Sequence, residues 1–312
     1  MKTFTFVLSL ITQDNDYQIE QAAAAEEAAR RLGVQVRTLF ADSDAIQQSQ
    51  QLLKIIQSNS EPLPDGILIE SAGGTALPHV ARAAAVAGIG WVVLNREVDY
   101  IHELRKLYQV PIFSVTSDNR EVGHIQGKQL RALLPNGGTV LYIQGPSESA
   151  SAKPRSEGIL ETKPADIQLK IIKGQWTEAS AYKAIQAWLR LSTSHQSHVD
   201  LVAAQNDAMA MGARKAFQEV TNLEARDRWL SLPYIGCDGV PKTGQAWVKN
   251  GTLAATIITP PLAGKAIEML IHALHTGIIP ANLTLMAPGS FPTLEALTSR
   301  TAKMNAASTG KP

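Results

Sequence analysis

A set of polar and aromatic residues follows the predicted strands of this sequence and is suited to binding hydroxyl groups. Asparagine and aspartate accept or bridge hydroxyls, arginine donates in a fixed fork, and aromatic rings cover apolar C–H faces. The set comprises Asn15, Tyr17, Asn95, Arg96, Gln144, Arg155, Trp176, Asn206, Asp207, Cys237 and Asp238. It predicts recognition of a small polyhydroxylated ligand such as a sugar.

Several members of the set also have a structural explanation. We favour Asp207 as the N-cap of a helix that starts at Ala208. For Trp176, residue type alone leaves ligand contact and structural packing equally open, and Arg96 is open to a surface ion pair. Cys237 is the only cysteine, so an internal disulfide is excluded, and we expect a buried, inert thiol.

The patterns expected of an enzyme are not found in the sequence. The double glycine Gly73-Gly74 lacks the Gly-x-Gly-x-x-Gly spacing of a nucleotide loop, and there is no Walker loop. The pair His272 and His275 is spaced to share a helix face, which we interpret as a solvated face in preference to a metal site. We therefore expect no catalysis, no cofactor and no metal.

Charge and hydropathy exclude further classes of protein. Lysine plus arginine number 29 and aspartate plus glutamate 28, so no strong overall field favours nucleic acid or an anionic membrane surface. No apolar run reaches the roughly 18 to 20 residues of a membrane helix. We therefore expect the protein to bind neither nucleic acid nor a membrane. We also expect it to be a monomer.

The elements that must position the polar set alternate between strand and helix. We predict strands at 3–11, 34–40, 66–70, 90–95, 112–115, 139–144, 168–173, 201–204, 233–237 and 254–258. We predict helices at 19–32, 45–58, 76–87, 120–134, 155–163, 179–191, 207–219 and 241–250. This alternation indicates βαβ units, and 312 residues exceed one ordinary core, so we predict an α/β fold of two doubly wound parallel-sheet lobes. Ligands bind such sheets beyond the carboxyl ends of the strands, where the polar set lies.

Three segments carry a resemblance to a known family. They are AQNDAMAMGA at 204–213, IGCDG at 235–239 and NGTLAATI at 250–257. With them the chain resembles, over almost its whole length, the type I periplasmic sugar-binding proteins typified by ribose-binding protein, which share their fold with the ligand-binding core of Lac-repressor-like regulators. The resemblance implies two lobes joined by a three-crossing hinge that closes on the ligand.

The resemblance also implies domain boundaries and site residues. The N-terminal lobe is expected at 1–115 plus 260–287, the C-terminal lobe at 116–259 plus 288–300, and a disordered tail at 301–312. The residues expected to face the interlobe cleft are Asn15, Tyr17, Asn95, Arg96, Arg155, Trp176, Asn206 and Asp238. Thr259 joins these candidates because it occupies the position of a hinge glutamine in the ribose binder.

Departures from the ribose binder bear on the ligand. Asn95 replaces an aspartate, and Gln18 and Cys237 replace aromatic residues, which should widen the pocket. A hexose, a polyol or a substituted sugar is therefore expected in place of ribose itself.

The resemblance implies a transport role with one competitor. We expect a substrate-binding component of an ABC-type sugar transporter, and the alternative is a ligand sensor for a kinase or regulatory partner. Because the first predicted strand begins at the N-terminus, we expect no DNA-binding domain before it. We expect a periplasmic location if a leader has been removed and a cytoplasmic one if Met1 is the native start.

Overall fold

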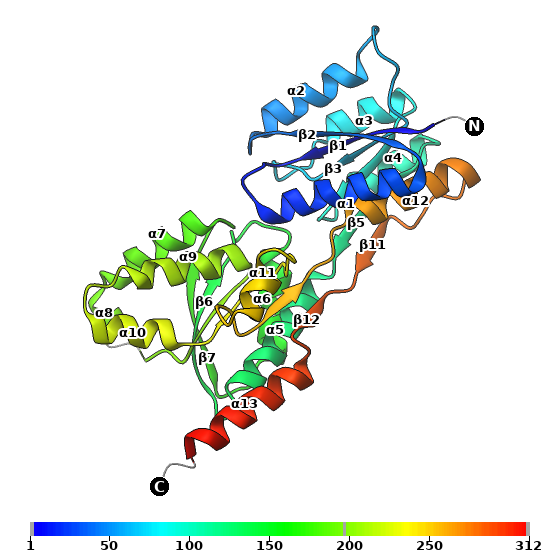
Figure 1. The fold of residues 1–312 in the computed structure, drawn as a ribbon. Helices are drawn as coiled ribbons and strands as arrows, with labels where there is room; N and C mark the ends of the chain where they lie inside the picture. The colour runs from blue at the N-terminus through cyan, green and yellow to red at the C-terminus, as the bar shows by residue number, and fades with distance from the viewer. Residues whose placement is uncertain (1–2, 196–197, 310–312) are drawn as a thin grey trace. The chain divides into compact units, whose positions relative to one another are not determined.

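The computed structural model describes residues 3–195 and 198–309, which fold as two compact units (Figure 1). Unit 1 comprises Met1–Ser117 and Pro260–Met286, and unit 2 comprises Asp118–Thr259 and Ala287–Pro312. The chain therefore passes from one unit to the other three times. Among the described residues, no helix combines the length and apolar character needed to cross a membrane.

Unit 1 is one parallel sheet covered by helices on both faces (Figure 1). Its strands run in the order β11-β5-β4-β3-β1-β2. Their bounds are β1 Thr5–Leu10, β2 Gln35–Phe40, β3 Gly66–Ile69, β4 Gly90–Leu94, β5 Ile112–Ser117 and β11 Leu283–Met286. The helices are α1 Asp16–Leu32, α2 Ala45–Ile56, α3 Pro78–Val86, α4 Tyr100–Leu107 and α12 Ala263–Thr276. Helices α2, α3 and α4 pack on one face, whereas α1 and α12 pack on the other.

Unit 2 repeats the arrangement around a smaller sheet with the order β7-β6-β8-β9. Its strands are β6 Gly138–Gln144, β7 Ile167–Lys173, β8 Leu201–Ala204 and β9 Tyr234–Ile235, and β10 Thr256–Ile258 pairs antiparallel with β12 Gly289–Phe291. Its helices are α5 Asn119–Leu133, α6 Ala152–Thr162, α7 Glu178–Leu189, α8 Ser192–His195, α9 Asp207–Gln218, α10 Leu223–Ser231, α11 Gly244–Lys249 and α13 Leu294–Thr309. Helices α7 and α9 cover one face, and α5, α6 and α13 cover the other.

The coverage of both sheet faces by helices follows from the apolar composition of the strands. Strands β3 and β4 are buried along their whole length, which requires helices on both faces of the sheet. In each unit the strand order reverses once. The switch point lies between β1 and β3 in unit 1 and between β6 and β8 in unit 2. The carboxyl ends at these switch points are where such sheets bind ligands. The predicted α/β fold class is confirmed.

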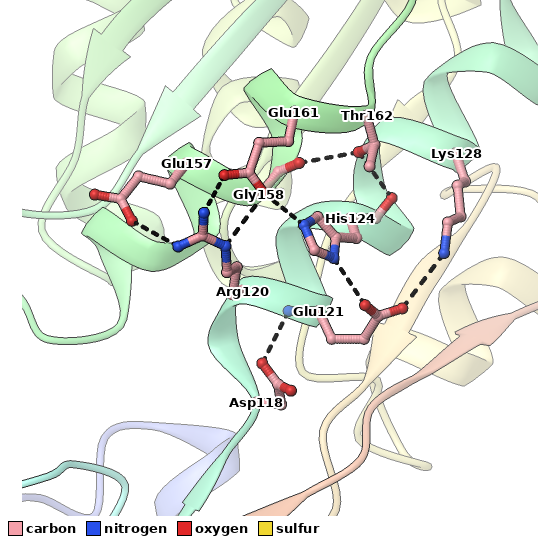
Figure 2. Close-up of polar contacts among 9 residues, drawn as sticks. All are labelled: Asp118, Arg120, Glu121, His124, Lys128, Glu157, Gly158, Glu161 and Thr162. Carbon is pink, nitrogen blue, oxygen red and sulfur yellow. Dashed lines mark hydrogen bonds and ion pairs between the residues drawn. The ribbon is translucent and has the colours of Figure 1, made fainter.

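Helices α5 and α6 pack with their backbones in close contact at two glycines. A Cβ on Gly123 would lie 2.2 Å from the Arg155 carbonyl oxygen, and a Cβ on Gly158 would lie 2.2 Å from the Arg120 carbonyl oxygen. Beside this crossing, His124 bonds Glu121 through Nδ1 at 2.8 Å and Glu161 through Nε2 at 2.7 Å (Figure 2). The helix crossing fixes the backbone of α6 at Arg155.

The C-terminal segment differs from its sequence prediction. Residues 301–309 continue helix α13, where the small polar composition predicted a disordered tail. The helix is anchored by Leu297, which is fully buried against unit 2, and its alanine-, lysine- and threonine-containing continuation extends that packed start. Residues 310–312 lie outside the described residues. Helices α4, α8 and α10 have no counterpart in the sequence prediction either, and α12 was anticipated only at the spacing of His272 and His275.

Candidate ligand-binding site

The loop after β1 places Asn15 and Tyr17 at the carboxyl edge of the unit 1 sheet. Asn15 has an extended backbone and is the N-cap of α1, with its Oδ1 accepting from the Gln18 amide at 3.2 Å. The Tyr17 ring is buried, and its hydroxyl donates to the Pro260 carbonyl at 3.4 Å. Tyr17 thereby connects the first turn of α1 to the segment that leads into α12.

Asn95 and Arg96 follow β4 at the same edge. Asn95 has φ +61°, a left-handed conformation that asparagine tolerates better than most residues, and its Nδ2 donates to Glu70 Oε1 at 2.9 Å. The Arg96 guanidinium donates to the carbonyls of Gly73 at 2.7 Å and Gly74 at 3.0 Å. Burial lowers the pKa of Arg96, while the nearby Glu70 opposes this shift. Arg96 therefore organises the loop after β3 and is not a surface ion-pair residue.

Glu70 is a residue of this edge that the sequence analysis did not select. It directly follows the last residue of β3, is 4% exposed, and has an Oε2 atom that is buried with no hydrogen-bond partner among the described residues. Burial raises the pKa of Glu70, and the hydrogen bond from Asn95 acts in the opposite direction. Glu70 ends the predicted strand 66–70 just as Asn95 ends the predicted strand 90–95, so the strand-end rule that selected Asn95 applied equally to Glu70.

Arg155 and Trp176 meet at the carboxyl edge of the unit 2 sheet. Arg155 is 5% exposed, and it donates through Nε to Asn119 Oδ1 at 2.9 Å and through Nη1 to the Gln205 carbonyl at 2.5 Å. Its guanidinium carbon lies 5.6 Å from the centroid of the half-buried Trp176 ring. A Cβ on Gly145 would lie 2.4 Å from Trp176 Cζ2, so glycine is required there for the indole to fit. The indole ring of Trp176 therefore lies between the Arg155 guanidinium and the backbone of Gly145.

Asn206 has the capping role that the sequence analysis assigned to Asp207. Helix α9 begins at Asp207, and the Asn206 Oδ1 accepts from the Met209 amide at 2.9 Å. The Asn206 Nδ2 donates to the Trp176 carbonyl at 2.9 Å, which fixes the loop carrying the indole. The prediction that Asp207 is the N-cap is wrong, because its carboxyl is buried and bonded to other segments.

Asp238 and Thr259 are joined through the backbone. Asp238 has φ +103° and is half-buried; its amide donates to the Ile257 carbonyl at 2.9 Å. Its carbonyl accepts from the Thr259 amide at 3.1 Å. Thr259 is 3% exposed, and its hydroxyl is also directed at the Asp238 carbonyl, at 3.5 Å. Thr259 thus supports the backbone of Asp238.

Cys237 lies immediately before Asp238 and is fully buried beside Val122, Ile125 and Ile257. Burial raises the pKa of its thiol to about 12, so the reactive thiolate is scarce at neutral pH. The predicted burial of Cys237 is confirmed.

Each unit therefore presents one polar edge. In unit 1 the sequence-selected Asn95 is bonded to Glu70, Arg96 follows Asn95 in the same loop, and Asn15 and Tyr17 lie at the start of α1. In unit 2 Trp176 contacts both Arg155 and Asn206, while Asp238 and Thr259 form a second connected pair. Within the described residues, no group of three or more histidine, cysteine, aspartate or glutamate side chains is placed to hold a metal ion. The groups at these edges can form hydrogen bonds and ring-stacking contacts with a ligand.

Two doubly wound units with polar carboxyl edges define the class of two-domain ligand-binding proteins. The periplasmic binding protein domain family matches residues 6–277, and the chain belongs to this family. The chain is 25% identical over 276 residues to the ribose import binding protein of Bacillus subtilis, which covers 87% of this chain and 83% of that protein.

Solved structures share the fold. An ABC transporter periplasmic solute binding protein from Actinobacillus succinogenes with bound D-allose superimposes with a TM-score of 0.79 at 21% identity, covering 95% of this chain and all of that chain. The fructose-binding periplasmic domain of a hybrid two-component system has a TM-score of 0.74 at 20% identity, covering 98% of this chain and 97% of that one.

Proposed function

We propose that this protein binds a sugar or polyol in a cleft between its two lobes, which close on the ligand, and that it delivers the ligand to an ABC-type importer. The observation that carries the proposal is the pair of polar carboxyl edges, which bear carboxylate, amide, guanidinium and aromatic groups in a member of the periplasmic binding protein family. The ribose and D-allose names of similar proteins support a monosaccharide ligand.

The proposed ligand contacts combine the residues selected from the sequence with one more. They are Asn15, Tyr17, Asn95, Arg96, Arg155, Trp176, Asn206, Asp238 and Thr259, together with Glu70. A hydroxyl both donates and accepts, so the mixture of carboxyl acceptors and guanidinium donors suits it. The Trp176 ring supplies an apolar surface for a C–H face of the sugar. The deep burial of Thr259 favours a supporting role behind Asp238.

The two lobes are proposed to close because the ligand binds residues of both units. Each unit carries only part of the hydrogen-bonding set, so a ligand that engages both sets stabilises the closed population. The three chain crossings, after Ser117, Thr259 and Met286, are the segments proposed to bend. We propose that binding, without catalysis, is the whole activity and that it takes place in the periplasm.

A thermal-shift panel of pentoses, hexoses, polyols and nucleosides tests the proposal. A cognate ligand at about 100 times its dissociation constant should raise the free energy of unfolding by about 2.7 kcal/mol. Titration calorimetry on each positive compound then gives the affinity and stoichiometry. The control is Asp238→Ala, which should abolish most of the shift. An unchanged melting temperature across the sugars and polyols would contradict the proposal.

A ligand sensor is the second candidate, because one structural neighbour is the fructose-binding domain of a hybrid two-component system. The two roles differ in the partner of the closed form. Co-purification of the sugar-loaded protein with a permease supports transport, and co-purification with a sensor kinase supports signalling.

A further inference from the structure

The carboxyl of Asp207 connects segments of unit 2 that are distant in sequence. Asp207 is 4% exposed; its Oδ2 accepts from the Gly239 amide at 2.9 Å, and its Oδ1 accepts from the Thr256 hydroxyl at 2.7 Å. Its own amide donates to the Cys237 carbonyl at 2.6 Å. Asp207 therefore bonds the residues on both sides of Asp238 and anchors them to β10.

Two glycines leave room for this carboxyl. A Cβ on Gly236 would lie 2.1 Å from Asp207 Oδ1, and a Cβ on Gly244 would lie 2.1 Å from Asp207 Oδ2. No alanine fits at either position without displacing the carboxyl. With both oxygens bonded and enclosed in this way, Asp207 has no surface to offer a ligand.

The backbone at Asp238 needs such support. Asp238 has φ +103°, and Gly239 after it has φ +59°. A non-glycine residue in a sparsely populated conformation persists only when its surroundings hold it there. The bonds from Asp207 to Cys237 and Gly239 act on the peptide groups that flank Asp238, so they set the direction of the Asp238 side chain.

We propose that Asp207 is a positioning residue that orients Asp238 for ligand binding without touching the ligand. This inference rests on the proposed function, because Asp238 is one of the proposed ligand contacts. It predicts that removing the Asp207 carboxyl harms binding only through Asp238.

A double-mutant cycle measured by calorimetry, with the sugar chosen by the thermal-shift panel, tests this dependence. Asp207→Ala should raise the dissociation constant about tenfold, and Asp207→Ala combined with Asp238→Ala should bind as Asp238→Ala alone does, within about twofold. Asp207→Asn should restore binding to within about threefold of wild type, because its amide can accept from Gly239 and donate to Thr256. The proposal is wrong if the losses of affinity in the two single variants multiply in the double variant. It is also wrong if Asp207→Ala binds the sugar with wild-type affinity.

The matched control is Asp200→Ala, at the opposite end of β8. Asp200 Oδ2 accepts from the Thr139 amide at 2.8 Å, so its loss also removes a carboxylate that bonds backbone. Asp200→Ala should lower the melting temperature and leave the dissociation constant within about twofold of wild type; equal weakening of binding would assign the effect to general destabilisation. If Asp207→Ala does not fold, Thr256→Val, which removes one bond to the carboxyl, takes its place in the cycle.

Hydrogen exchange of the ligand-free protein separates this inference from the proposed function. The Gly239 amide should exchange at least about tenfold faster in Asp207→Ala than in wild type, with no such change in Asp200→Ala. Wild-type protein that binds no sugar would overturn the proposed function alone, whereas unchanged exchange at Gly239 would overturn the role of Asp207.

Discussion

At the scale of single residues, the carboxyl edges are built from side chains that have a structural partner as well as a proposed ligand. Asn206 caps α9 and holds the Trp176 loop, and Arg155 is braced by Asn119 before any sugar arrives. Side chains that are already held in place lose little conformational entropy when a ligand binds, and this favours high affinity. Glu70 differs, because one carboxyl oxygen is buried with no hydrogen-bond partner among the described residues.

Glu70→Gln should weaken sugar binding about tenfold or more. The amide oxygen would keep the bond from Asn95, so an N–H group would replace the Oε2 acceptor, and a sugar hydroxyl left without its acceptor costs about 1 to 3 kcal/mol. Calorimetry measures the change, with the exposed Glu61→Gln as control. Unaltered affinity in Glu70→Gln would remove Glu70 from the site.

Glu70→Gln should also change the pH dependence of stability. Because burial raises the pKa of Glu70, the wild-type protein loses stability as pH rises from the ordinary value of 4.5 through the raised pKa. The variant has no carboxyl to ionise, so its melting temperature should fall less over this range in a thermal scan.

At the scale of elements, the crossing of α5 and α6 determines where Arg155 lies. Gly123→Ala would place a methyl group 2.2 Å from the Arg155 carbonyl oxygen and force α6 to move. We expect a loss of about 1 to 3 kcal/mol of stability, measured by urea unfolding, together with weaker sugar binding. Gly289→Ala in β12 is the control, because a Cβ there meets nothing within 4 Å. Equal stabilities of the two variants would contradict the close packing.

The same helix pair should make the stability of unit 2 depend on pH. Hydrogen bonds to Glu161 and Glu121 raise the pKa of His124 above 6.5, and Arg120, Glu157 and Lys128 complete the charges around it (Figure 2). A raised histidine pKa gives stability that is present below pH 6.5 and lost as pH rises through the raised value. The melting temperature of His124→Gln should therefore fall less between pH 6 and 8 than that of wild type. If the melting temperature of His124→Gln changes with pH as that of wild type does, the network does not contribute to stability. The exposed His79→Gln is the control.

At the scale of the whole molecule, each unit is assembled from segments that are far apart in the chain. Unit 1 is completed by α12 and β11, and unit 2 by β12 and α13. The C-terminal helix is thus part of the core of unit 2, although its composition predicted a tail.

Leu297→Ala should destabilise unit 2 by about 2 to 5 kcal/mol, because the leucine is fully buried in the core that β6 and β8 share with α5. Hydrogen exchange should show faster exchange in these elements and an unchanged rate in β3 and β4 of unit 1. The exposed Leu223→Ala is the control. Uniform acceleration in both units would mean that they unfold as one.

The sequence by itself determined the alternation of strands and helices, the two-unit α/β class and most of the residue types at the strand ends. These follow from local patterns: apolar runs, helix periodicity and helix caps such as Gly33, whose left-handed backbone ends α1. Residue type alone also anticipated the buried thiol of Cys237.

Only the tertiary structure decided how adjacent residues divide their roles. Asn206 caps a helix locally, whereas the partners of Asp207 lie 32 and 49 residues away, and Glu70 depends on Asn95 across 25 residues. The anchoring of α13 likewise depends on a core formed by strands much earlier in the chain. Burial and long-range hydrogen bonds arise only when distant segments pack, so no local pattern could assign them.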